Sequence, residues 1–333
     1  MSASSPDPRS LRTMEGWVQW GRTLVDPEDA GRRLDVYLAR RFTYRSRTGW
    51  AQKIREGRMR VGGERVRPSY LLKAGDLLQY RADPLPEPEV ETRCPTLHED
   101  ESLLAVNKSG NIPVHPAGRY FRNCLLHLLS PRGAKEPHLR VVHRLDRETS
   151  GVVVFAKSAA AARSLGRQFE ERTVRKSYLA VVWGTLTGER DVDLPLGYRP
   201  SAAIAKAVGI VPGGRPARTR LRPLASRDGV TLVEAIPLTG RLHQIRVHLQ
   251  ASGFPLLGDR LYGRDARLFL KSLAGPLDTD DDAFLGFRRQ ALHALKLAFD
   301  HPETGGRLEI VAAPPEDFSR LLKERGLDGG LGA

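Results

Sequence analysis

A proline-rich stretch at residues 81 to 91 constrains the fold of this chain more than any other feature. Its sequence is RADPLPEPEVE, with Pro84, Pro86 and Pro88 at alternating positions. Proline fixes its own φ and has no N–H to donate, so this pattern is excluded from helix interiors and central strands. We therefore predict an extended linker over residues 83 to 95, with separate domains before and after it.

The segment before the linker has the pattern of a small basic module, which we place at residues 27 to 82. The run GRRLDVYLARRF has apolar residues at helical spacing, and WAQKIREGRMRVGGERV predicts a helix, a turn and a strand. Residues 27 to 80 contain 13 Lys and Arg against 6 Asp and Glu, a net +7 of the whole chain's +14. Such a concentration favours a polyanionic partner, although charge alone is also typical of a solvated helix face.

Other features limit the class of protein. Residues 1 to 26 are rich in Ser, Pro and Arg and are predicted to form a poorly ordered leader, although Trp17, Val18 and Trp20 could begin a strand. The opening MSASSPDPRS lacks the apolar core of a signal peptide. No apolar run reaches the roughly 18 residues that a membrane-spanning helix needs, so no membrane association is expected. The two cysteines, Cys94 and Cys124, form no CxxC pair, which argues against a disulfide framework or a thiolate zinc site. We expect a cytoplasmic protein.

Beyond the linker, short apolar runs predict strands. They are LLAVNK, GVVVFAK, YLAVVWG, TLVEAIPL and LEIVAA, and AAAARSLGRQFEER predicts a helix among them. Strands and helices do not alternate as βαβ units, so we predict an α+β fold. Residues 96 to 320 would form a mixed, largely antiparallel sheet with flanking helices, after the small basic α/β module. We expect a surface loop at the acidic DTDDD of residues 278 to 282, and a C-terminal tail over residues 321 to 333.

Two clusters of polar residues carry the chemistry. The first is VVHRLDRETSGVVVFAK at residues 141 to 157, and the second is GRLHQIRVHLQASGFPLLGDRLYG at residues 240 to 263. Together they offer Asp146 flanked by several guanidinium groups, which would keep its carboxylate ionised at neutral pH. That state suits a nucleophile or a base. Taken alone, the first cluster is more typical of a charged turn held by salt bridges, and the second cluster changes that balance.

The segments HRLDRETSG, GRLHQIRVHL and GDRLYG resemble the signature segments of the RluA-like family of pseudouridine synthases. The resemblance extends over residues 28 to 315 and includes LHEDESLLAVNKSGNIPVHP, RKSYLAVVWG and LHALKLAFDHPETG. The basic module is similar to the alpha-L RNA-binding module. The family implies an enzyme that isomerises uridine in structured RNA without a cofactor or a metal, because the base only detaches at N1, rotates and rejoins through C5.

The resemblance also implies roles for individual residues. Asp146 corresponds to the catalytic aspartate, which either attacks the sugar or removes a ribose proton. Arg144 would help to extrude the uridine from its stack. Tyr178 would pack against the flipped base, and Arg246 would orient Asp146. The remaining expected contacts are His143, Gln244 and the apolar wall Leu256 in the substrate pocket, and Arg45, Arg47, Lys53, Arg55 and Arg58 against the RNA backbone.

Several alternatives remain open at this level. His143, His243 and His248 lack the spacing of a zinc site, so we expect them to support neighbours by hydrogen bonds rather than bind a metal. A noncatalytic RNA-binding ribosome-assembly factor would use the same basic surfaces. An N-glycosidase would cleave the same bond, but such enzymes usually need a second carboxylate. The basic module favours large-subunit ribosomal RNA over transfer RNA as substrate, and we expect a monomer.

Overall fold

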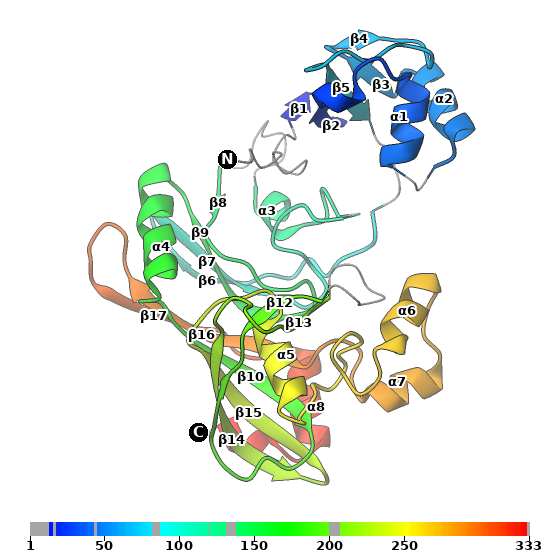
Figure 1. Cartoon of the computed structure of the whole chain (residues 1–333). Coiled ribbons are helices and arrows are strands. Elements are labelled where there is room, and N and C mark those ends of the chain that lie inside the picture. The colour runs from blue at the N-terminus through cyan, green and yellow to red at the C-terminus, as the bar shows by residue number, and fades with distance from the viewer. Residues whose placement is uncertain are drawn as a thin grey trace. The chain divides into compact units, whose positions relative to one another are not determined.

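The computed structural model describes residues 13–15, 18–42, 45–81, 87–118, 120–130, 138–199 and 207–331. The chain divides into a small unit, Met1–Pro86 with Gly133–Glu136, and a large unit, Glu87–Arg132 with Pro137–Ala333. Figure 1 shows the two units in different parts of the chain's colour range. The first prolines of the predicted linker lie outside the described residues, and Pro88 belongs to the large unit.

The small unit is an antiparallel sheet with two helices. The predicted order of helix, turn and strand is confirmed, and Gly62 and Gly63 adopt positive φ in the tight turn that joins β3 to β4. Tyr37 and Trp50, one from each helix, are buried against the sheet. The sheet order is β1-β2-β5-β3-β4. The elements are β1 (Thr13–Glu15), β2 (Val18–Leu24), η1 (Pro27–Asp29), α1 (Leu34–Arg41), α2 (Arg47–Arg55), β3 (Met59–Val61), β4 (Glu64–Arg65) and β5 (Leu77–Arg81).

The predicted leader at residues 1 to 26 needs correction at its C-terminal end. Residues 18 to 24 form β2, which pairs antiparallel with β5 from Trp20↔Arg81 to Leu24↔Leu77. Backbone pairing within the small sheet therefore makes this segment part of the module. Residues 1 to 12 lie outside the described residues.

The large unit is built on a ten-stranded sheet with the path β11-β14-β15-β10-β16-β9-β7-β6. The strand pairs are antiparallel except β16 with β9, so the predicted mixed, largely antiparallel α+β fold is confirmed. Its first half comprises β6 (Thr96–Glu99), β7 (Leu103–Lys108), α3 (Leu125–Leu128), β8 (Arg140–Val141), β9 (Ser150–Ala156), α4 (Ala159–Glu171), β10 (Arg175–Trp183), β11 (Arg190–Asp193) and β12 (Leu196–Tyr198). Its second half comprises β13 (Val208–Ile210), β14 (Arg218–Arg227), β15 (Val230–Pro237), α5 (Gln244–Ala251), α6 (Arg267–Ala274), α7 (Thr279–Leu285), β16 (Leu292–Asp300), β17 (Arg307–Val311), α8 (Glu316–Glu324) and η2 (Asp328–Leu331).

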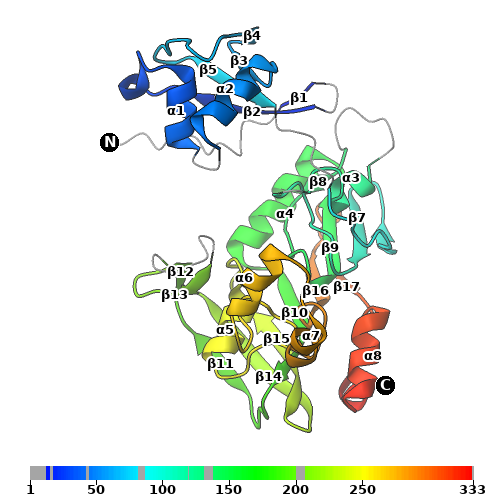
Figure 2. The same ribbon diagram turned by 90° about the vertical axis from the view of Figure 1, so that its right-hand side faces the viewer.

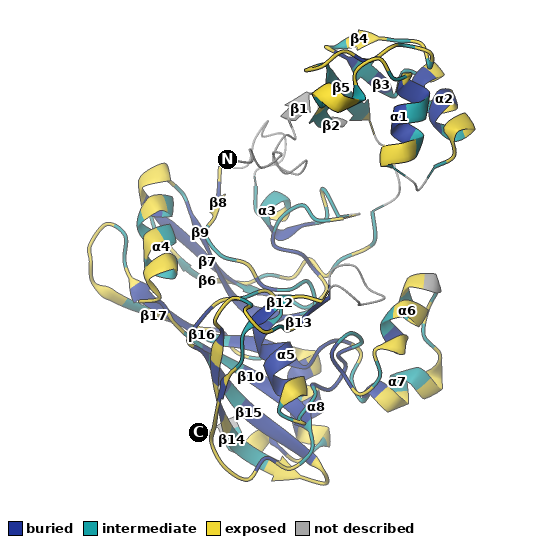
Figure 3. Cartoon of the chain, in the orientation of Figure 1, coloured by how far each residue is buried: buried dark blue, intermediate teal, exposed yellow. Residues whose placement is uncertain are grey.

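Strand β10 separates two layers of the core. Ala180 and Val182 pack in a cluster with α5, whereas Leu179 and Val181 pack in a cluster with α8. This follows from the period of two along a strand, which sends successive side chains to opposite faces. Figure 2 shows α5 and α8 at separate positions around the sheet, and Figure 3 shows the buried interior between them. The face covered by α5 also carries Tyr178.

Two predictions about the C-terminal third were wrong. The expected tail at residues 321 to 333 instead continues the fold, since Leu321, Leu322 and Leu327 are buried in the cluster beneath α8. The expected loop at residues 278 to 282 begins helix α7 instead. Its Asp278 caps the helix by accepting the backbone N–H of Asp281 at 2.9 Å, and acidic residues in a first turn favour the helix dipole.

The parallel contact of β9 with β16 fixes the start of β9. Gly151 has φ +115°, and a Cβ at this position would lie 2.2 Å from the carbonyl oxygen of Ala294. Only glycine allows this approach of the two backbones. The loop that carries Asp146 ends directly before this point, so close packing of the strands sets its position. No helix in the described part of the chain is long and apolar enough to cross a membrane.

Candidate active site

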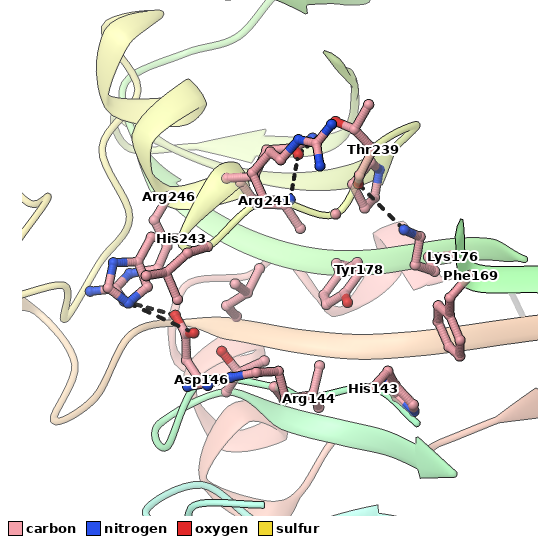
Figure 4. Close-up of a pocket in the computed structure, with 18 of the residues that line it drawn as sticks. His143, Arg144, Asp146, Phe169, Lys176, Tyr178, Thr239, Arg241, His243 and Arg246 are labelled. Atoms are coloured by element: carbon pink, nitrogen blue, oxygen red, sulfur yellow. Dashed lines mark hydrogen bonds and ion pairs between the residues drawn. The ribbon is translucent and has the colours of Figure 1, made fainter. Parts of the chain in front are cut away.

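The two polar clusters meet at a pocket of about 790 Å³ in the large unit. The loop before β9 forms one side, β10 forms the floor, and the loop between β15 and α5 forms the other side. Figure 4 shows Asp146 facing Arg246 and His243 across this pocket, with Tyr178 beside them. Segments about 100 residues apart in the chain therefore share one site.

Asp146 is held by a chain of ionic hydrogen bonds. Nη1 of Arg246 donates to Oδ2 of Asp146 at 2.8 Å. The other edge of the same guanidinium donates to both oxygens of Asp259, from Nε at 2.6 Å and from Nη2 at 2.9 Å. The Asp259 side chain is fully buried and also accepts the backbone N–H groups of Leu261 and Tyr262. This arrangement fixes the guanidinium plane, so Arg246 presents one defined N–H to Asp146.

The electrostatics of the pocket keep Asp146 ionised. Burial alone would raise the pKa of its carboxyl, but the nearby charge of Arg246, supported by His243 and by the hydrogen bond, holds that pKa below its ordinary value. Burial and the charge of Asp146 raise the pKa of Tyr178 far above its usual range, so its phenol is neutral. The site thus combines one carboxylate with one neutral aromatic donor.

Apolar side chains surround this polar centre. Leu145, Ile245 and Leu292 line the pocket together with Tyr178. Arg144, two residues before Asp146, is exposed and lines the same pocket. A planar base would therefore find an aromatic face and apolar walls beside the carboxylate. Such a pocket suits a base that has left its stack, with its sugar presented to Asp146.

Comparison with known proteins identifies the chain. A family model described as RNA pseudouridylate synthase matches residues 102–251, and an S4 domain model matches residues 32–78. The ribosomal large subunit pseudouridine synthase D of Xanthomonas campestris is 35% identical over 311 residues, which cover 90% of this chain and 91% of that protein. The chain belongs to the RNA pseudouridylate synthase family.

Further relatives agree with the family assignment. The ribosomal large subunit pseudouridine synthase C of Vibrio vulnificus is 32% identical over 315 residues, covering 90% of this chain and 94% of that protein. The structure of human RNA pseudouridylate synthase domain containing 1 superposes with a TM-score of 0.55 at 29% identity, over 69% of this chain and 86% of that one. The protein is an RNA pseudouridine synthase, an isomerase, with an N-terminal S4 RNA-binding domain, as the sequence predicted.

Two residues of the synthase's predicted pocket have other roles in the structure. Leu256 is buried in the core cluster beneath α5 and does not line the pocket, because its backbone forms a bridge to Val182 in β10. Gln244 lines the pocket, but its amide already makes four hydrogen bonds, with Thr239, Arg241, Arg218 and Thr219. A primary amide has no further capacity. Gln244 thus holds the loop before α5, and its contact with substrate stays a prediction.

The three histidines of the motifs all hydrogen-bond to neighbours. His143 accepts the backbone N–H of Val154 at 2.9 Å, and burial lowers its pKa to about 4, so the ring is neutral. Its ring stacks on that of Phe169 at 5.0 Å. His248 is bonded to the Thr219 hydroxyl and the Leu194 carbonyl.

His243 lies between the carboxylate of Asp146 and the hydroxyl of Tyr262. Its Nε2 is 3.9 Å from Oδ1 of Asp146, and its Nδ1 is 2.9 Å from the hydroxyl of Tyr262. That hydroxyl also accepts the backbone N–H of Val208 in β13. His243 thereby links the Asp146 loop to the β12–β13 hairpin.

Sequence reasoning missed Asp259 and Tyr262, although both lie in the quoted GDRLYG motif. A signal was available, since an aspartate inside a run with buried apolar neighbours requires a partner. The Tyr262 ring lies 4.8 Å from the guanidinium carbon of Arg246, so it packs on the same group that Asp259 holds. Spacing could not reveal this contact, because β15 and α5 must first bring Arg246 beside the loop.

Asp259 should therefore stabilise the fold as well as orient the site. We expect Asp259→Asn to lower the free energy of unfolding by about 3 kcal/mol, because it leaves a buried guanidinium with one carboxylate partner fewer. Denaturant unfolding measures the change. Asp265→Asn, at an exposed ion pair with Arg267 in the same segment, is the matched control and should change stability little. Equal effects of the two variants would contradict the role of Asp259.

The basic residues predicted to contact RNA occupy the S4 domain. Arg47 pairs with Asp35 at 3.0 Å, and Lys53 pairs with Glu56 at 2.8 Å, whereas Arg55 is exposed on α2. Arg45 lies over the Trp50 ring at 6.0 Å. Arg58 follows α2 directly before β3 and is half-buried.

Proposed function

We propose that this synthase isomerises specific uridines in large-subunit ribosomal RNA, with Asp146 as its catalytic carboxylate. The relatives from Xanthomonas campestris and Vibrio vulnificus carry names that specify the large ribosomal subunit. The observation that carries the catalytic assignment is the 2.8 Å bond from Arg246, which holds an ionised carboxylate beside the apolar side chains and the Tyr178 ring of the pocket. Transfer RNA is the alternative substrate.

The reaction conserves every atom of the substrate. The bond from C1′ to N1 breaks, the uracil rotates, and a bond from C1′ to C5 forms while C5 loses a proton and N1 gains one. Asp146 either attacks C1′ or removes a ribose proton, and both roles need its ionised form. Tyr178 would pack on the detached base and hold it during rotation. Arg144, exposed at the pocket mouth, would fill the space that the flipped uridine leaves in the RNA.

The test is to incubate purified protein with ribosomal and transfer RNA from cells that lack the gene, and then to map pseudouridines chemically. A new pseudouridine in large-subunit RNA supports the proposal, and one in transfer RNA alone overturns the choice of substrate. Free uracil would indicate an N-glycosidase. RNA binding without modification, also on precursor particles, would favour the assembly factor.

We further propose that the protein acts in the cytoplasm as a monomer.

The S4 domain should supply much of the RNA affinity, through Arg45, Arg47, Lys53, Arg55 and Arg58. We expect deletion of residues 1 to 82 to weaken RNA binding and to flatten its dependence on salt, because fewer counterions are released. Turnover of a short substrate at high concentration should persist, since the pocket lies in the large unit. Filter binding across a salt series gives the slope of log affinity against log salt concentration. Unchanged affinity and slope would contradict this division of labour.

A further inference from the structure

Besides Arg144 at the pocket mouth, four cationic side chains line the active-site pocket without taking part in the Asp146 network. Arg172 follows α4, Lys176 lies on β10, Arg215 lies in the segment before β14, and Arg241 lies in the loop before α5. Figure 4 shows Lys176 and Arg241 away from the group formed by Asp146, His243 and Arg246. The pocket therefore has a neutralised end at Asp146 and a positive end at these four residues.

None of the four cations has a carboxylate within ion-pair distance among the residues that the structure describes. Nζ of Lys176 donates to the carbonyl of Thr239 at 3.3 Å, and Nε of Arg241 donates to the carbonyl of Pro216 at 3.1 Å. Glu170 is the second carboxylate of the described lining besides Asp146, and it forms no ion pair there either. Four positive charges thus face one pocket with little compensation.

The cations are close enough to disfavour one another's charge. Burial lowers the pKa of Lys176 to about 8, and Arg172 adds to the effect. Burial, followed by the charges of Arg215 and Arg172, lowers the pKa of Arg241. A cluster of this kind in the free protein is relieved when an anion enters. Uracil and ribose are neutral, so the anion that RNA can supply at this distance from the base is its phosphodiester.

We propose that Arg172, Lys176, Arg215 and Arg241 form a phosphodiester site that holds the RNA backbone beside the flipped nucleotide. The inference rests on the proposed function, because it takes the base to lie at Asp146 and Tyr178. Lys176 lies on the border of a second hollow of about 340 Å³ that also contains Arg175 and Lys296. The backbone would leave the pocket past Lys176 and cross this part of the sheet. The site positions substrate and takes no part in bond cleavage.

The experiment measures binding of in-vitro-transcribed large-subunit ribosomal RNA to the full-length protein over a series of salt concentrations. The variants are Lys176→Gln, Arg241→Gln and Arg172→Gln, of which the last changes an exposed side chain and avoids a folding defect. The matched control is Lys323→Gln, which removes the same charge from the exposed side of α8. That helix packs on the opposite face of β10 from Tyr178.

Each pocket variant should make the slope of log affinity against log salt shallower by roughly 0.7 for each phosphate that is no longer neutralised, while the control keeps the wild-type slope. Unchanged slopes, or an equal change in the control, would overturn the site. Pseudouridine formation is measured in parallel. If wild type modifies no RNA but the pocket variants still have shallower salt slopes than wild type, the proposed function fails and the anion site stands. If wild type modifies RNA and the pocket variants keep the wild-type salt slope, only the proposed phosphodiester site fails.

Discussion

Asp146→Asn should reduce pseudouridine formation by at least roughly a thousandfold while the protein still binds RNA. The amide keeps the shape of the side chain, but it neither attacks C1′ nor accepts a ribose proton. Arg246 should stay in place, because both oxygens of Asp259 hold its other edge. The measurement is single-turnover pseudouridine formation at saturating enzyme, with RNA affinity determined separately.

The matched control for this prediction is Glu170→Gln. Glu170 is the other carboxylate of the described pocket lining, and it carries no ion pair among the described residues. Its neutralisation should leave the rate within a few-fold of wild type, since no reacting atom is assigned to it. Near-normal activity of Asp146→Asn, or an equal loss in Glu170→Gln, would show that Asp146 is not the carboxylate that matters.

Arg246→Met should move the acid limb of the pH dependence of kcat/KM to higher pH and lower the rate at neutral pH by roughly a hundredfold or more. Wild-type Asp146 has a pKa below its ordinary value, because the charge of Arg246 outweighs burial. Without that charge, burial dominates and raises the pKa. A higher pH is then needed to ionise the carboxyl, which fixes the direction of the shift.

Arg246→Lys separates charge from geometry in the same experiment. Lysine keeps a positive charge in the pocket, so the acid limb should stay closer to wild type. The lysine ammonium lacks the planar guanidinium that donates to both oxygens of Asp259 and to Asp146 at the same time. The rate should therefore still fall. Thermal unfolding of each variant controls for loss of the buried pair with Asp259. An acid limb that stays in place in Arg246→Met would remove the electrostatic role.

The fold was largely predictable because its signals are local. The apolar runs at β7, β9, β10 and β15 have the length and composition of strands, and helix α4 follows from the helical spacing of Ala161, Leu165 and Phe169. The predictions that failed, the loop at residues 278 to 282 and the leader at residues 1 to 26, rested on weaker local signals. The acidic residues at the start of α7 looked like a loop because they form the cap and first turn of a helix, and β2 looked like a leader because a single strand shows no partner in sequence.

The candidate site was predictable to the level of motifs. HRLD, KSY and HQIR place Asp146, Tyr178 and Arg246, and the structure brings these three side chains to one pocket. Their catalytic and binding roles remain proposals. Leu256 lies in the core instead of the pocket lining, and the amide of Gln244 already has its full set of hydrogen bonds. Proximity to a motif does not predict which way a side chain points or whether its hydrogen bonds are already used.

The sequence by itself determined the class of fold, the S4 domain and the family, since each depends on residue order over short segments. Only the tertiary structure decided that Asp259 anchors Arg246 and that four further cations gather in the pocket of Asp146. The physical reason is that strand pairing and the packing of α5 bring together residues that are far apart in the chain. Burial then gives those contacts their strength, because charges removed from water interact strongly with whichever partners the fold supplies.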